Sequence, residues 1–144
     1  MHTIMDYDDT AHRRQVIDLW QAVLGYKDAH NDPQRAIDKK QAVHDGLFFV
    51  AWDDGMVVGT IMAGYDGHRG WLYSVAVRPS HRHQGIGADL VRHAEQALLR
   101  HGCVKINLMI LAGNEAVTGF YQTLGYQVEP RIAMGKRCPE NCVD

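Results

Sequence analysis

Short apolar runs rich in β-branched and aromatic residues alternate with polar segments in the middle of the chain. Two of these runs, at residues 47–52 and 56–63, are joined by an Asp-Asp-Gly segment at residues 53–55. This is a strong β-hairpin signal, because aspartate and glycine accept the backbone angles of a tight turn. A third run lies at residues 71–77, after a segment bounded by glycines at residues 64–70. The pattern predicts three consecutive strands.

Elsewhere apolar residues recur at helical spacing, as Val16, Trp20, Val23 and Leu24 do. Thr10 is placed to cap this first helix, with Asp9 close by. Further helices are predicted from residues 31–33 to about Gly46, over 87–101 and over 114–124, and further strands over 105–111 and 126–136. With a strand at the start of the chain, the order is strand, two helices, three strands, helix, strand, helix, strand. This order predicts an α/β or α+β fold with a mixed sheet.

Length and composition restrict the function. The 144 residues are 46% hydrophobic and 22% charged, which is typical of one soluble globular domain, here expected to span residues 1–144. A net charge of −2 predicts no nucleic-acid partner and no attraction to anionic membranes. No apolar run approaches the length of a membrane span, and the polar N-terminus does not resemble a signal peptide. We therefore expect a cytoplasmic location.

The most informative segment, Arg-His-Gln-Gly-Ile-Gly-Ala at residues 82–88, joins the strand at 71–77 to the helix that follows. The first N–H groups of a helix have no intrahelical acceptor and carry partial positive charge, so they suit a phosphate. The alternative is that this segment only connects the strand to the helix and binds no ligand. The spacing is neither Gly-x-Gly-x-x-Gly nor Gly-x4-Gly-Lys-Ser/Thr, which disfavours a dinucleotide fold and a P-loop.

The Arg-x-x-Gly-x-Gly spacing in residues 82–87 resembles the pyrophosphate-binding signature of the GNAT superfamily of acetyl-CoA-dependent N-acetyltransferases. Asn114 and Tyr121 are similar to the family's Asn…Tyr-x-x-x-Gly-Phe/Tyr segment. Residues 64–70 most resemble the YpeA-like group of small bacterial acetyltransferases. The resemblance implies a single GNAT domain with a central mixed, mostly antiparallel sheet flanked by helices.

It also implies transfer of acetyl from acetyl-CoA to a primary amine of a small molecule or a protein, by direct attack in a ternary complex. Pantetheine would run beside the strand at 71–77 like an extra strand, and the backbone N–H groups of 83–88 would hold the pyrophosphate with help from Arg82 and Arg78. The implied acetyl-CoA contacts are Val75, Ala76, Val77, Arg82, His83, Gln84, Gly85, Ile86, Gly87, Ala88, Asn114 and Tyr121.

Two of these contacts have alternatives. Asn114 is also suited to cap a helix. Tyr121 matches the family tyrosine that protonates the leaving thiolate as a general acid, and its alternative is a core aromatic residue beside Phe120.

The general base is open. Relatives that acetylate ribosomal-protein N-termini carry a glutamate five residues before the Asn, where this chain has Met109, so that substrate does not simply carry over. Asp66, His68 and Tyr73 are candidate bases, and His68 has a suitable unperturbed pKa. The alternatives are that these residues belong to a polar loop with no role in catalysis, or that a chain of water molecules carries the proton to solvent.

The acceptor amine is expected to contact Tyr65, Asp66 and Tyr73. Simple strand alternation places Tyr73 and Val75 on one face, roughly 7 Å apart. Rival interpretations are a non-catalytic acyl-CoA-binding module, and an enzyme for another acyl-CoA. No acyl-enzyme is expected, since no Ser or Cys stands with a His and an acid. A homodimer is expected from the resemblance only.

No metal is predicted, although His81 and His83 form a His-x-His pair. Three cysteines give no disulfide framework. Cys103 is expected to be a buried small apolar residue, and Cys138 and Cys142 are expected to be free thiols of a polar tail.

Overall fold

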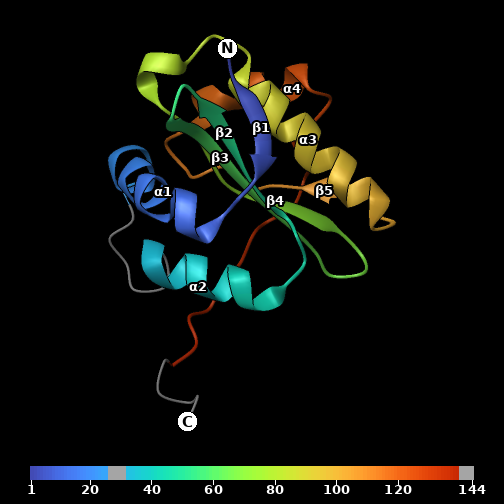
Figure 1. Ribbon diagram of the computed structural model, residues 1–144. Helices are drawn as coiled ribbons and strands as arrows, with labels where there is room; N and C mark the ends of the chain where they lie inside the picture. The colour runs from blue at the N-terminus through green and yellow to red at the C-terminus, as the bar shows by residue number, and fades with distance from the viewer. Residues whose placement is uncertain (26–31, 140–144) are drawn as a thin grey trace. The chain divides into compact units, whose positions relative to one another are not determined.

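The computed structural model describes residues 1–25 and 32–139 (Figure 1). Residues 1–109 form one compact unit and the chain from Ile110 onwards forms a second, and each is described by itself. The first unit holds a five-stranded sheet in the order β1-β2-β3-β4-β5. Four strands pair antiparallel and β5 runs parallel to β4, which confirms the predicted mixed, mostly antiparallel sheet. The strands are β1 Thr3–Asp6, β2 Phe48–Asp53, β3 Met56–Tyr65, β4 Gly70–Val77 and β5 Ile106–Asn107.

Helices cover both faces of this sheet (Figure 1). On one face α1 (Asp9–Val23) packs onto β3 and β4, and α2 (Pro33–Val43) packs against α1, with Trp20 fully buried and stacked on Phe48. On the other face lies α3 (Ile86–Arg100). Its close approach requires Gly59, because a Cβ there would lie 2.9 Å from Leu90 Cδ1.

The helix starts differ in detail from the prediction. The cap of α1 is Asp8 and not Thr10, since the Asp8 carboxylate accepts the Ala11 N–H at 2.8 Å. The second helix, α2, begins at Pro33, within the predicted start, and the Asp32 carboxylate caps it; Asn31 lies outside the described residues. The second helix ends at Val43, earlier than predicted.

The prediction was poorest toward the C-terminus. Of the strand expected over 105–111, only the two residues of β5 pair with the sheet. The helix expected over 114–124 is a 3₁₀ turn, η3 (Glu115–Val117), followed by α4 (Thr118–Thr123). The strand expected over 126–136 is wrong, because the described residues form no strand there. Val128, Ile132 and Met134 are exposed, and β-propensity makes no strand without a partner to pair and pack against.

The cysteines lie as expected where they are described. Cys103 is buried and Cys138 is exposed, whereas Cys142 lies outside the described residues.

Candidate active site

The glycine loop leads from β4 through a 3₁₀ turn, η2 (Pro79–His81), into the start of α3. Gly85 holds the N-cap position with φ +83°, a conformation that favours glycine. No side chain caps α3, and the first intrahelical bond runs from the Asp89 N–H to the Gly85 carbonyl at 3.0 Å. A Cβ on Gly85 would meet nothing within 4 Å. The first N–H groups of α3 therefore have no capping side chain, which fits an anionic group of the pyrophosphate kind.

The two arginines near this loop differ in their contacts. Arg82 Nε donates to the Val77 carbonyl at 3.3 Å and the side chain is exposed beside the loop. Arg78 instead turns toward β3 and donates to the Val57 carbonyl at 3.1 Å. Its Nε is buried and has no hydrogen-bond partner in the part of the chain that the structure describes. Arg82 is thus the better placed of the two for an incoming anion.

The two histidines of the His-x-His segment, for which no metal was predicted, have different surroundings. His81 Nε2 lies 3.4 Å from Asp53 Oδ2, and its Nδ1 is 2.8 Å from Ser80 Oγ. His83 is exposed and has a left-handed φ of +64°. Among residues 1–25 and 32–139, no group of three or more His, Cys, Asp or Glu side chains is arranged to hold a metal ion.

β4 contains a bulge that the sequence did not predict. Thr60 pairs with Ala76 and Met62 pairs with Tyr73, so Ile61 alone opposes two residues, Ser74 and Val75. Ser74 has φ +49°, which costs a residue other than glycine about 1–3 kcal/mol, so surrounding contacts must stabilise this conformation. The expectation that Tyr73 and Val75 share a face by simple alternation is wrong, because the bulge interrupts the alternation between them.

Beyond its first two residues, β4 has an open edge. β5 pairs only with Gly70 and Trp71, and the rest of this edge has no strand partner among the described residues. The Arg78 N–H donates to the Val58 carbonyl at 2.8 Å. Since hydrogen-bonded and non-hydrogen-bonded pairs alternate in an antiparallel ladder, Ala76 directs its backbone to β3 and Val77 directs its own to the open edge. An extended chain that carries amides can add along such an edge.

The segment between β3 and β4 carries the candidate base and acceptor contacts. Asp66 Oδ1 accepts the N–H groups of His68 at 2.8 Å and Arg69 at 2.7 Å. These bonds lower the pKa of Asp66, so it is a poor proton acceptor at neutral pH. His68 is exposed. Burial, and then the charge of Asp66, raises the pKa of the half-exposed Tyr73.

Tyr65 has a structural contact in this region. Its hydroxyl lies 3.3 Å from the Gly67 carbonyl and 3.4 Å from the Gly102 carbonyl, and donates to them. It thereby links the β3–β4 segment to the end of α3. Of the predicted acceptor contacts, Asp66 and Tyr73 lie close enough to interact electrostatically.

The remaining predicted residues lie in the second unit. Tyr121 packs edge-on against Phe120 and Tyr126, at ring distances of 4.9 and 5.9 Å, and burial raises its pKa. Its hydroxyl is therefore protonated at neutral pH, as a general acid requires. Asn114 stands at the N-cap of η3, but its side chain makes no capping hydrogen bond and is exposed. Met109, the last residue of the first unit, is also exposed.

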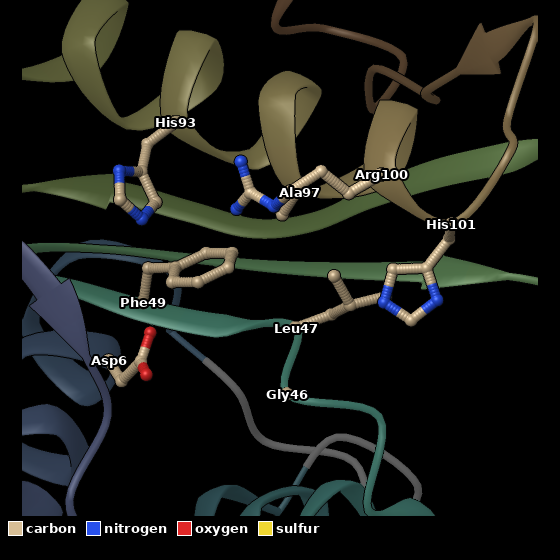
Figure 2. A pocket seen from close by; sticks show the side chains of 8 residues that line it. All are labelled: Asp6, Gly46, Leu47, Phe49, His93, Ala97, Arg100 and His101. Carbon is tan, nitrogen blue, oxygen red and sulfur yellow. The ribbon is translucent and has the colours of Figure 1, made fainter.

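A cavity of about 280 Å³ lies away from the glycine loop, between β2 and the C-terminal half of α3 (Figure 2). His93 and Arg100 project from α3 over Phe49, whose ring lies 4.6 Å from that of His93. The other lining residues are Asp6, Gly46, Leu47, Ala97 and His101. Sequence reasoning missed this cavity, since its residues come from separate elements and resemble an ordinary helix surface. The C-terminal end of a helix carries partial negative charge, so the glycine loop suits a pyrophosphate better.

The unpaired edge of β4 and the uncapped start of α3 together offer a site for an extended ligand that carries an anionic group. The chain belongs to the acetyltransferase (GNAT) family, whose model matches residues 13–126, as the resemblance predicted. An acetyltransferase from Pectobacterium atrosepticum is 42% identical over 111 residues, which is 77% of this chain and 79% of that protein. One from Sodalis glossinidius is 41% identical over 128 residues, covering 88% and 89% of the two chains.

Solved structures show the same fold. The PaiA N-acetyltransferase of Thermoplasma acidophilum, in complex with coenzyme A, aligns with a TM-score of 0.70 at 18% identity and covers 92% of this chain and 93% of that one. No helix among the described residues is long and apolar enough to cross a membrane.

Proposed function

We propose that this acetyltransferase moves acetyl from acetyl-CoA to a primary amine by direct attack within a ternary complex. The observation that carries the proposal is the continuity of the open β4 edge with the uncapped start of α3. The pyrophosphate binds the N–H groups of residues 83–88 and the charge of Arg82. The pantetheine arm lies along β4, where Val77 and the bulge residue Val75 offer backbone groups. The resemblance to the family gives Asn114 a further contact with the cofactor.

In the transfer step the amine nitrogen attacks the thioester carbonyl, the C–S bond breaks, and an amide and a thiolate form. Backbone N–H groups at the bulge stabilise the oxyanion, a contribution of roughly 3 kcal/mol where it has been measured in other enzymes. Tyr121 gives its proton to the thiolate. The proton of the amine leaves through His68 or through water, since the pKa of Asp66 is too low for this duty.

Asp66 is better suited to attract a cationic amine, with Tyr65 and Tyr73 beside it. The acceptor is a small molecule or a protein amine. The cytoplasmic location, the homodimer and the single-domain organisation stay predictions from composition and resemblance.

Release of free thiol tests this proposal. Purified protein is incubated with acetyl-CoA and a panel of small amines and peptides, and products are identified by mass spectrometry. Thiol release that requires an amine, with matching amide product, is expected. Propionyl-CoA and malonyl-CoA in parallel reactions test the choice of acyl group. If acetyl-CoA binds but no amine in the panel causes release of free thiol, the proposal is wrong and the protein is a non-catalytic acyl-CoA-binding module.

A further inference from the structure

A buried threonine connects α1 to the bulge in β4. Thr60 lies on β3 with no exposed surface. Trp20 Nε1 donates to Thr60 Oγ1 at 2.8 Å, and Thr60 Oγ1 donates to the Ser74 carbonyl at 2.9 Å. Helix α1 is thus joined to the neighbouring strands β3 and β4 by two hydrogen bonds at the point where β4 leaves regular pairing.

The direction of these bonds is fixed by chemistry. An indole N–H only donates, so the Thr60 oxygen must accept from Trp20 and its single proton is available for Ser74. The Ser74 carbonyl therefore accepts a hydrogen bond from a side chain on the neighbouring strand. The hydrogen bond forms only when the Ser74 carbonyl faces Thr60, so it favours the left-handed backbone that Ser74 adopts at φ +49°.

We propose that Thr60, held by Trp20, is a positioning residue that fixes the bulge and so aims the backbone of Val75 at the thioester. The inference rests on the proposed function, because the bulge matters for turnover only if the acyl group lies against it. Thr60 itself touches no reacting atom. It acts through Ser74, by keeping one backbone conformation populated.

A purely structural role is the competing explanation. Trp20 stacks on Phe48 in the core beneath the sheet, so any change there will lower stability. A positioning role and a purely structural role predict different turnover for a variant that keeps the Thr60 hydroxyl but loses core packing. Thr60→Val keeps the shape and removes the hydroxyl, so both hydrogen bonds are lost, whereas Thr60→Ser keeps the hydroxyl and removes a methyl group.

The experiment compares these two variants with the wild-type enzyme at a temperature where all are folded. We expect Thr60→Val to lower kcat/KM for acetyl-CoA about tenfold and to shift the amide resonances of Ser74 and Val75. Thr60→Ser should return kcat/KM to within about threefold of wild type, although it also loses core packing. Trp20→Phe, which removes the first donor together with part of a packed ring, gives a second route with a smaller effect of the same kind.

The control is Ile37→Val, a fully buried residue of the same core on α2 that touches neither Thr60 bond. It should lower the melting temperature and leave kcat/KM unchanged. The positioning role is refuted if Thr60→Val behaves like Ile37→Val, or if Thr60→Ser is as impaired as Thr60→Val. Failure of the wild-type protein to use acetyl-CoA would instead refute the proposed function, and the positioning role with it.

Discussion

Replacing Gly85 with alanine separates the glycine loop's role in binding from its role in folding. Gly85 has φ +83°, and a left-handed backbone costs an alanine about 1–2 kcal/mol relative to glycine. A Cβ at this position meets no atom within 4 Å, so no steric clash within the protein adds to that cost. The perturbation is therefore a known backbone penalty at the start of α3, together with a methyl group in the space that the pyrophosphate is to enter.

The bound complex must carry the whole penalty, because the loop has to keep its shape around the phosphates. If the free loop relaxes, the 1–2 kcal/mol is lost from binding and acetyl-CoA affinity falls about 5- to 30-fold. If the free loop keeps its shape, the melting temperature falls by about 3–8 °C and the methyl group obstructs the ligand. Calorimetric titration with acetyl-CoA and a thermal melt, run on the same sample, measure both quantities.

Gly55→Ala is the matched control. Gly55 lies in the β2–β3 hairpin with φ +79°, and a Cβ there also meets nothing within 4 Å. Its backbone penalty is the same, but it lies outside the proposed site, so only the melting temperature should fall. An acetyl-CoA affinity for Gly85→Ala that equals that of Gly55→Ala would refute the reasoning about the loop.

Other consequences are tested more simply. Tyr121→Phe keeps the ring and removes the proton donor, so kcat should fall by roughly 10²-fold with little change in acetyl-CoA affinity. An unchanged kcat, measured where chemistry limits turnover, would show that Tyr121 serves packing alone. The raised pKa of Tyr121 also predicts that wild-type kcat declines only in strongly alkaline solution, where the hydroxyl loses its proton. His68→Ala should impair turnover and leave acetyl-CoA binding intact, whereas Asp66→Asn should mainly raise KM for a cationic amine; weakened acetyl-CoA binding in both would contradict their placement. Burial lowers the pKa of His12, whose Nδ1 accepts the Asp8 N–H at 2.9 Å, so stability should be full above about pH 6.5 and fall as the pH drops below that value. Melting temperatures of wild type and His12→Gln across this range check the sign, and equal slopes would exclude His12 as the cause.

The sheet, the long helices and the glycine loop were predictable because each follows from a local pattern. Strand runs, helical spacing and a glycine pair are read over a few neighbouring residues. The bulge at Ser74 was not predictable in this way. No glycine marks it, and its backbone is held by a hydrogen bond from Thr60, on another strand.

In the candidate site, too, some features follow from a local pattern and others depend on contacts between separate elements. Residues 82–88 were found from their spacing, whereas the availability of Val77 and the loss of Ala76 to β3 depend on strand register. The Asp66 carboxylate accepts backbone N–H groups of its own turn, and this depends on the conformation of that turn, which the sequence does not specify. The false strand over 126–136 shows the converse, since apolar residues there suggested pairing for which the described chain offers no partner.

The central claim is that acetyl-CoA binds along β4 and the start of α3. Amide resonances of labelled protein, followed during titration with acetyl-CoA, test it most directly. Saturable shifts are predicted for residues 74–77 and 83–88, with little change at His93 and Arg100 in the separate cavity. Shifts centred on His93 and Arg100, or the absence of saturable binding, would contradict the claim.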